Sequence, residues 1–169
     1  PEKCGQCGEC ALLCPRAAIR MNLLPDTPAK HMPKNFPMTS IKPRPISGKN
    51  ITLQISVDDC IACGACTAVC PTSALSLTSV TPELKDTLRE NVAYFQKLPA
   101  TDALTLDVGS VRDLALKKPL FEFASTAQPS FQSTYLKIVS QLFGSRALIS
   151  GSRDGIDELC GAIPSIPFA

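Results

Sequence analysis

One cysteine pattern occurs twice in this chain and constrains its fold more than any other feature. Residues 3–15 read KCGQCGECALLCP, and residues 59–71 read DCIACGACTAVCP. Both copies follow the spacing C-x2-C-x2-C-x3-C-P, with a constant offset of 56 residues, as from position 4 to position 60. The repeated cysteines are Cys4, Cys7, Cys10, Cys14, Cys60, Cys63, Cys66 and Cys70. The chain must therefore fold around whatever these side chains bind.

The clustering of the cysteines separates three kinds of chemistry. Disulfide frameworks spread their cysteines along a short secreted chain, whereas eight of the nine cysteines here lie in two short runs. Zinc sites usually combine two Cys-x-x-Cys pairs that are about a dozen or more residues apart. Three cysteines in such a short loop suit a cuboidal iron–sulfur cluster better, so a pair of zinc knuckles is the less favoured alternative.

The run resembles the signature of bacterial ferredoxins, in which the fourth cysteine of each motif ligates the other cluster. The resemblance implies an α+β, ferredoxin-like domain over residues 1–80 that contains two [4Fe–4S] clusters. Three thiolates on one tight loop leave the fourth iron of a cube facing away, so its ligand comes from elsewhere. The implied ligands are Cys4, Cys7, Cys10 and Cys70 for the first cluster, and Cys60, Cys63, Cys66 and Cys14 for the second. On this reading neither copy of the motif folds alone.

Residues around the cysteines agree with such a loop. Gly5, Gly8 and Gly64 lack a Cβ, which lets the chain curl closely and direct amide N–H groups toward sulfur. Pro15 and Pro71 then turn the chain away. The short apolar stretches that follow are expected to cover the clusters: Ala17, Ala18 and Ile19 in one copy, and Ala74, Leu75 and Leu77 in the other.

Charge and hydropathy argue against two other classes of function. The net charge is +2, and there is no basic run of the kind that binds nucleic acid. No apolar stretch approaches the ~18 residues that span a bilayer. No targeting segment is visible, and the start at Pro-Glu-Lys-Cys suggests a piece of a longer protein. Clustered cysteines indicate an intracellular, reducing compartment, such as cytoplasm or an organelle matrix.

The connection between the motifs is long and rich in proline. Residues 22–50 hold six prolines, which exclude a long helix or a central strand, so we expect an extended surface loop. Its basic residues are Lys30, Lys34, Lys42, Arg44 and Lys49, against a single acid, Asp26. The loop could dock an acidic partner, although packing against a neighbouring domain is the simpler reading. His31, the single histidine, is expected to be solvated.

The remaining elements follow from periodicity. Alternation in ITLQISV (51–57) predicts a half-buried strand. Thr81-Pro82 predicts a helix start, and 81–118 is expected to be a packing helix followed by a linker from 100. The apolar face expected for this helix is Leu84, Leu88, Val92, Phe95 and Leu98. Within 119–169 we expect a strand at 119–123, a helix at 133–144 and a buried strand at 146–150, which together would be a small α/β fragment.

The order of these parts resembles the pyruvate:ferredoxin (flavodoxin) oxidoreductases, which use thiamine diphosphate. The segment PLFEF…TYLKIVSQLFGSRALISGS is similar to the start of their thiamine-diphosphate-binding domain, so 119–169 is expected to be a degenerate fragment of it. In that family a Cys-x-x-Cys pair and a later cysteine ligate a third cluster. Here Ala127, Ser130 and Gly155 fall at those positions, and Cys160 alone cannot rebuild the site. The thiamine-diphosphate and Mg²⁺ segment of the family lies further downstream than residue 169, so we expect no thiamine diphosphate on this chain.

Two classes of function remain open from the sequence. The first is electron transfer through two clusters, as a non-catalytic domain or subunit of a larger oxidoreductase with a protein electron donor or acceptor. The second is a structural or interaction subunit that keeps its clusters because the fold needs them. Reversible reduction separates these two readings.

Overall fold

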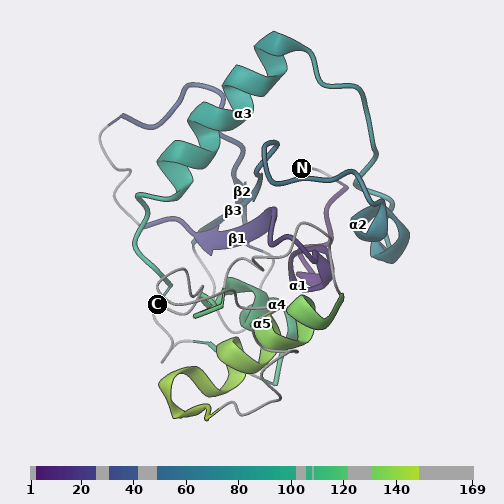
Figure 1. Cartoon of the computed structure of the whole chain (residues 1–169). Helices are drawn as coiled ribbons and strands as arrows, with labels where there is room; N and C mark the ends of the chain where they lie inside the picture. The colour runs from purple at the N-terminus through teal and green to yellow at the C-terminus, as the bar shows by residue number, and fades with distance from the viewer. Residues whose placement is uncertain are drawn as a thin grey trace, which may run out of the picture.

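A small antiparallel sheet lies between two groups of helices (Figure 1). The computed structural model describes residues 3–25, 31–41, 49–101, 106–107, 109–121 and 131–148. Its elements are α1 (Glu9–Leu13), β1 (Ile19–Leu23), β2 (Thr39–Ser40), β3 (Asn50–Ile55), α2 (Ala65–Val69), α3 (Pro82–Phe95), α4 (Val111–Leu116), α5 (Phe131–Phe143) and the 3-10 turn η2 (Gly144–Arg146). The long helix α3 lies on one side of the sheet, and α1, α4 and α5 lie on the other.

The predicted strand at 51–57 is present as β3, and it is the central strand. The sheet order is β1-β3-β2, with Ile19 opposite Ile55 in one pair and Thr39 opposite Ile51 in the other. The expectation of a half-buried strand is wrong, because α3 covers its second face. Thr52 is only 1% exposed there, and its hydroxyl donates to the Pro37 carbonyl at 2.7 Å.

The proline-rich insert is more structured than predicted. It contains β2, which pairs with β3 at the edge of the sheet, where a short strand tolerates neighbouring prolines. Phe36 is buried against Tyr94 of α3, with ring centroids 4.8 Å apart. His31 is exposed, as expected, and so are Lys34 and Lys49. The other basic residues of the insert, Lys30, Lys42 and Arg44, lie outside the described residues.

Helix α3 begins where the sequence predicted and buries part of the predicted face. The Thr81 hydroxyl accepts from the Leu84 amide at 3.3 Å, and Pro82 occupies the first turn. Of the predicted apolar face, Leu98 is buried just beyond the end of the helix and Phe95 packs on the same hydrophobic cluster. The N-terminal part of that prediction was wrong, because Leu84 is 39% exposed, whereas Asn91 and Tyr94 are buried instead.

The segment 100–118 is not merely a linker. Within it, α4 buries four consecutive residues and packs on both α1 and β1. Buried Asp113 accepts from the Asp107 amide at 3.1 Å and pairs with Arg112 at 3.1 Å. Helix α4 has only 6 residues, which is too short for a periodic pattern of apolar residues to predict it.

The helix predicted at 133–144 is present as α5, which starts two residues earlier, but its buried face is polar. The expected face (Leu136, Val139, Leu142 and Phe143) is at best half-buried, and Phe143 is 52% exposed. The buried residues instead form one stripe along the helix: Ser133, Thr134, Lys137, Ser140 and Gln141. The apolar pattern misled because this helix packs on backbone carbonyls, which require donors.

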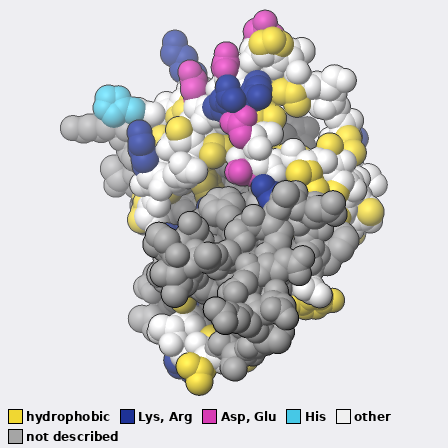
Figure 2. Space-filling model, viewed as in Figure 1, with side chains coloured by type: hydrophobic (Ala, Val, Ile, Leu, Met, Phe, Trp, Pro, Cys, Tyr) yellow, Lys and Arg dark blue, Asp and Glu magenta, His cyan; other side chains and the backbone are white. Residues whose placement is uncertain are grey.

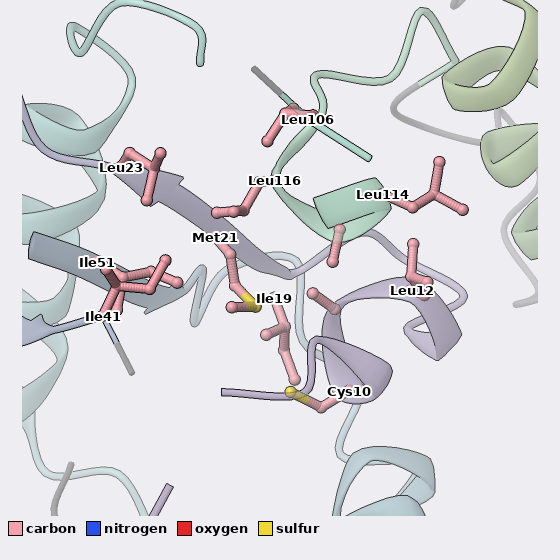
Figure 3. Packing of buried hydrophobic residues seen from close by; sticks show 12 residues of the cluster. Cys10, Leu12, Ile19, Met21, Leu23, Ile41, Ile51, Leu106, Leu114 and Leu116 are labelled. Atoms are coloured by element: carbon pink, nitrogen blue, oxygen red, sulfur yellow. The ribbon is translucent and has the colours of Figure 1, made fainter. Parts of the chain in front are cut away.

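The main core lies between the sheet and the helices α1 and α4. Figure 3 shows Cys10 directed toward Ile19 and Met21 of β1, with Leu114 and Leu116 of α4 closing the other side. One of the repeated cysteines is therefore part of the hydrophobic core. This core joins the first motif, the sheet and the segment after residue 109 into one body.

Other expectations for 119–169 have mixed outcomes. Phe121 is only 1% exposed and forms an isolated bridge, whereas the rest of the predicted strand beyond it lies outside the described residues. At 146–148 the predicted buried strand is absent: Arg146 ends η2, and Leu148 is 98% exposed. Ala127, Ser130, Gly155 and Cys160 also lie outside the described residues.

Substitution of two equivalent glycines should separate loop strain from packing. Gly8 and Gly64 both have positive φ, so alanine at either position should cost about 1–2 kcal/mol. At Gly8 a Cβ would also lie 2.7 Å from the Ala115 Cβ, whereas at Gly64 its nearest neighbour would be 3.9 Å away. Gly8→Ala should therefore reduce the free energy of unfolding by roughly another 1–3 kcal/mol. It should lower the thermal unfolding midpoint further than Gly64→Ala does. Equal losses, measured anaerobically, would contradict the packing of α4 on the first motif.

Candidate iron–sulfur site

The two cysteine copies adopt the same backbone conformation. Gly8 and Gly64 have φ of 83° and 77°, and each precedes a short helix whose third and fourth residues donate their amides to the glycine carbonyl. Non-glycine residues in the left-handed region also occur in equivalent pairs: Gln6 (58°) with Ala62 (54°), and Ala17 (48°) with Ser73 (48°). Residues in such strained backbone conformations occur at functional sites, where the surrounding structure holds the backbone in place. The sequence repeat is thus also a structural repeat.

The first cavity combines cysteines from both copies. It is lined by Cys4, Cys7 and Cys10 of the first copy and by Cys70 of the second. Ala74 and Leu75, which follow Cys70, line it as well, together with Ile51 and Leu53 of β3 and three residues of the insert, Pro37, Met38 and Thr39. The insert is therefore part of the wall of this cavity, a role that its composition did not indicate.

The second cavity shows the reverse combination. Cys60, Cys63 and Cys66 of the second copy line it together with Cys14 of the first. The residues after Cys14 contribute in the same way, with Arg16, Ala18 and Ile19 in the wall. The eight predicted cysteines are thus grouped in the crossed sets that the ferredoxin resemblance implies. Ala74 and Leu75 of the second tail line the first cavity, and Ala18 and Ile19 of the first tail line the second, whereas Leu77 lines the cavity of its own copy.

Backbone amides point at the sulfur atoms of the crossing cysteines. The Ala18 amide donates to Cys14 Sγ at 3.3 Å, and the equivalent Ala74 amide donates to Cys70 Sγ at 3.2 Å. The Gln6 amide adds a third such bond, to Cys4 Sγ at 3.4 Å. Gln6 follows the predicted Gly5, whereas Ala18 and Ala74 each lie four residues after a crossing cysteine, away from the predicted glycines. N–H···S bonds stabilise negative charge on sulfur, as thiolate ligation requires.

Burial and neighbouring thiols shift the acidities within each set. Burial, and then the nearby Cys7 and Cys4, raise the pKa of Cys10 to about 12. Burial also raises the pKa of Cys66, with further contributions from Cys14, Cys60 and Cys63. The pKa of Cys70 is instead lowered, chiefly by the Ala74 amide. Thiols must lose their protons to bind metal, so ligation at the buried cysteines would release protons at neutral pH.

The two copies differ strongly in their surroundings. In the first, α1 buries Cys10, Ala11 and Leu12 and packs against α4 and α5. In the second, α2 buries no residue and packs mainly on α1. Cys60 and Cys63 are exposed, whereas Cys10 is buried. Figure 1 shows α2 at the margin of the molecule.

Helix α5 supplies side-chain donors to the turn that carries Cys14. Ser133 donates to the Pro15 carbonyl at 2.8 Å, and Thr134 donates to the Leu13 carbonyl at 3.3 Å. The Lys137 ammonium donates to the carbonyls of Ala11 and Cys14 at 2.7 and 3.1 Å. Burial lowers the pKa of Lys137 to about 8. Sequence reasoning missed this contact because a lone lysine in an apolar helix gives no signal of burial.

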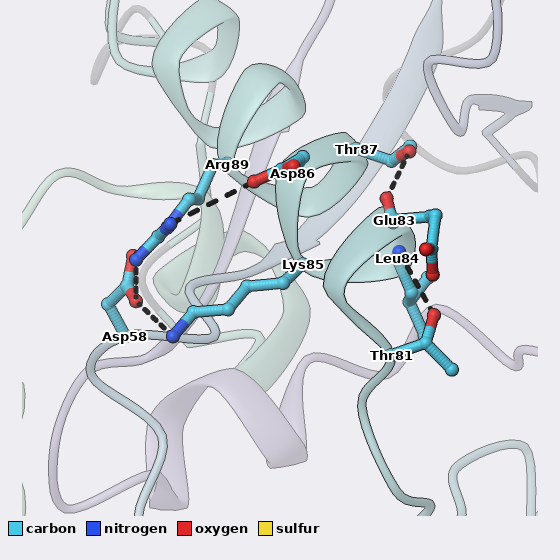
Figure 4. Close-up of polar contacts among 8 residues, drawn as sticks. All are labelled: Asp58, Thr81, Glu83, Leu84, Lys85, Asp86, Thr87 and Arg89. Carbon is cyan, nitrogen blue, oxygen red and sulfur yellow. Dashed lines mark hydrogen bonds and ion pairs between the residues drawn. The ribbon is translucent and has the colours of Figure 1, made fainter.

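The loop before Cys60 is fixed to α3 by ion pairs. Arg89 forms a two-pronged contact with Asp58, both distances being 2.8 Å, and Lys85 adds a third contact at 3.4 Å (Figure 4). Hydrogen bonds from Arg89 hold the pKa of Asp58 below its usual value. These groups belong to the mixed charges visible over α3 in Figure 2. Solvent screens such pairs, so they orient the loop and stabilise it little.

The donor set fits clusters better than single ions. In the described part of the chain no group of three or more Cys, His, Asp or Glu side chains is placed to hold a metal ion. A cubane cluster differs because each thiolate binds its own iron, so its ligands surround a volume and need not converge on a point. Two cavities with four thiols each, apolar walls and amide donors have the chemistry that such a cluster requires. Among the described helices, none is long and apolar enough to cross a membrane.

Comparisons with known proteins agree with this site. Residues 3–74 match the 4Fe–4S dicluster domain family. The whole chain aligns with a putative pyruvate-flavodoxin oxidoreductase of Synechocystis sp. at 33% identity. It aligns at 31% identity with the pyruvate:ferredoxin oxidoreductase of Moorella thermoacetica over 99% of the chain, and with a mitochondrial NADP(+) pyruvate dehydrogenase of Euglena gracilis over 90%.

The chain is a relative of the pyruvate:ferredoxin and pyruvate-flavodoxin oxidoreductases. The resemblance to that family is thereby confirmed, and it extends through residues far beyond the dicluster domain. The chain nevertheless spans only 15% of the Synechocystis relative and 14% of the Moorella one. Most of the length of these oxidoreductases has no counterpart in this chain, so their activity cannot be transferred to it directly.

Iron removal should affect the two copies unequally. Without iron, the first copy still packs on α4, α5 and β1, whereas the second rests chiefly on α1. We expect chelation under anaerobic, reducing conditions to increase amide hydrogen exchange far more in 60–73 than in 4–17. The helix α3 serves as the internal control and should change little. Equal increases in both copies would contradict this difference in support.

Proposed function

We propose that this chain transfers electrons through two [4Fe–4S] clusters as a domain or subunit of a larger oxidoreductase complex. The observation that carries the proposal is the grouping of cysteines in two cavities, each with three thiols from one copy and the fourth from the other. Homology to pyruvate oxidoreductases supports an electron-transfer role in a related enzyme. Clusters of this type supply reversible one-electron chemistry when bound.

The proposed ligands are those implied by the ferredoxin resemblance. They are Cys4, Cys7, Cys10 and Cys70 for the first cluster, and Cys60, Cys63, Cys66 and Cys14 for the second. The protein's own contribution is to exclude water and to stabilise charge on sulfur. Apolar residues such as Ile19 and Leu75 line the cavities, and the amides of Ala18 and Ala74 donate to the crossing thiolates.

The setting and partners belong to the same proposal. None of the eight described cysteines forms a disulfide, and we propose a reducing, intracellular compartment for the chain. Electrons would come from or leave to another domain or a small redox protein, as expected for a chain that covers a minor part of its relatives. No catalytic residue is assigned. Ala127, Ser130 and Gly155 stand where the third cluster of the family would need cysteines, so we propose that this chain has no third cluster. We also propose that thiamine diphosphate does not bind to this chain.

Serine substitution at the crossing cysteines tests the ligand sets. Cys14→Ser should perturb the EPR signal of the cluster built from the second copy, and Cys70→Ser should perturb that of the first. Cys60→Ser and Cys4→Ser are the matched references that identify each signal. If Cys14→Ser and Cys4→Ser alter the same signal, the ligation is not crossed.

Anaerobic protein-film voltammetry tests electron transfer itself. The holoprotein should show reversible one-electron reductions for both clusters and should exchange electrons with a viologen in solution. A scaffold that keeps its clusters only for folding is the second candidate, and it would bind iron without reversible reduction. Iron content measured on the same sample separates that outcome from a chain that binds no iron.

The isolated chain should not oxidise pyruvate. Supplied with pyruvate, thiamine diphosphate, Mg²⁺ and coenzyme A, it should reduce no viologen above the level without pyruvate. The reason is that the third-cluster cysteines are replaced, so no internal route would join a thiamine adduct to the two clusters. Pyruvate-dependent reduction by the purified chain would overturn this reading of Ala127, Ser130 and Gly155.

A further inference from the structure

The proline-rich insert (22–50) forms part of the wall of one cluster cavity. We propose that residues 36–41 of this insert, the cover segment, shield the first cluster from solutes, and that Gln6 holds the cover segment in place. The inference rests on the proposed two-cluster function. It assigns a role in the protection of one redox site to a part of the chain that lies outside both cysteine motifs.

Three consecutive residues of the cover segment belong to the wall of the first cavity. Pro37, Met38 and Thr39 line this cavity together with its four cysteines. Met38 is also 45% exposed, so its side chain lies between the cavity and water. Within the part of the chain that the structure describes, no residue of the insert lines the second cavity, where Cys60 and Cys63 are exposed.

Contacts with the core and the sheet fix the cover segment on its inner side. Phe36 and Ile41, at its two ends, are each only 6% exposed. Between them, the Thr52 hydroxyl of β3 donates to the Pro37 carbonyl at 2.7 Å, and β2 pairs with β3. These contacts join the cover segment to the sheet. A separate contact is needed to join it to the cysteine loop that forms the rest of the wall.

Gln6 makes that contact. Its side-chain amide donates to the Ser40 carbonyl at 2.9 Å, and its backbone amide donates to Cys4 Sγ at 3.4 Å. Gln6 is 4% exposed, so the bond to Ser40 is largely protected from competition with water. A single residue therefore links a proposed cluster ligand to the edge strand β2.

The internal repeat separates the role of the Gln6 side chain from that of its backbone. Its counterpart in the other copy, 56 residues later, is Ala62, which has nearly the same φ, 54° against 58°. Ala62 is exposed and has no side-chain donor. The backbone conformation of the loop therefore does not require glutamine, whereas the bond to Ser40 does require a side-chain donor.

The test is the initial rate at which EDTA removes iron from each cluster of the holoprotein under anaerobic conditions. Samples are reduced at intervals, and each cluster is followed by the EPR signal that Cys4→Ser or Cys60→Ser identifies. In the unsubstituted chain the second cluster should lose its iron first. Gln6→Ala should speed the loss from the first cluster by roughly two- to tenfold, because removal of one hydrogen bond increases local opening by about this factor. The rate for the second cluster should not change.

Met38→Ala should act in the same direction, because it shortens the side chain between the first cavity and water. Two substitutions serve as controls and should leave the rate for the first cluster unchanged. Ala62→Gln alters the equivalent position of the other copy, and Lys34→Gln alters an exposed residue of the insert.

Amide hydrogen exchange separates local opening from a general loss of stability. In Gln6→Ala, exchange should increase in 36–41 and stay unchanged in β1. Unchanged rates for the first cluster in both Gln6→Ala and Met38→Ala would overturn the inference, as would equal acceleration of both clusters. Absence of clusters in the unsubstituted chain would be seen first in the iron content, and it would refute the proposed function instead.

Discussion

The crossing of the two cysteine copies, in which each supplies the fourth cysteine of the other's cavity, is the constraint on which the rest of the structure depends. Each copy places three cysteines around its own cavity and sends its fourth cysteine, with the apolar tail behind it, to the other cavity. Because of this exchange α1 packs against α2, and the tail after Cys14 continues directly into β1. The sheet then carries α3 on one face and the first motif on the other, so the remaining elements are arranged around the crossing.

The same crossing explains which features the sequence could predict. Local chemistry determines the cysteine loops, the strand at β3 and the start of α3 at Thr81-Pro82, and these were predicted correctly. The grouping of the cysteines also followed from the motif, although ligation itself is still a proposal. Part of the buried face of α3, the helix α4 and the edge strand β2 were missed because each depends on partners distant in sequence.

Helix α5 is the clearest case of a pattern that pointed the wrong way. Reading its apolar spacing as the core face assumes that a helix packs on apolar side chains. Its actual partner is a set of backbone carbonyls around the Cys14 turn, which need N–H or O–H donors once they are buried. Ser133, Thr134 and Lys137 satisfy them. No periodicity in α5 could reveal this requirement, since it arises at the end of α1, more than a hundred residues away.

Duplication with unequal surroundings gives the chain two similar sites that need not behave alike. In the first copy α1 packs against α4 and α5 and Cys10 is buried, whereas in the second Cys60 and Cys63 are exposed and α2 buries no residue. The chain aligns with a small part of much longer pyruvate oxidoreductases. The difference in burial between the two copies would suit the proposed transfer of electrons between a protein interior and a partner.

Anaerobic determination of iron and acid-labile sulfide per chain is the measurement that tests the central claim most directly. Two [4Fe–4S] clusters require about eight irons and eight sulfides for each polypeptide. About four of each would mean that only one cavity forms a cluster, and the crossed arrangement would then fail. Zinc without sulfide would contradict the cluster assignment entirely, because the eight cysteines would then hold ions.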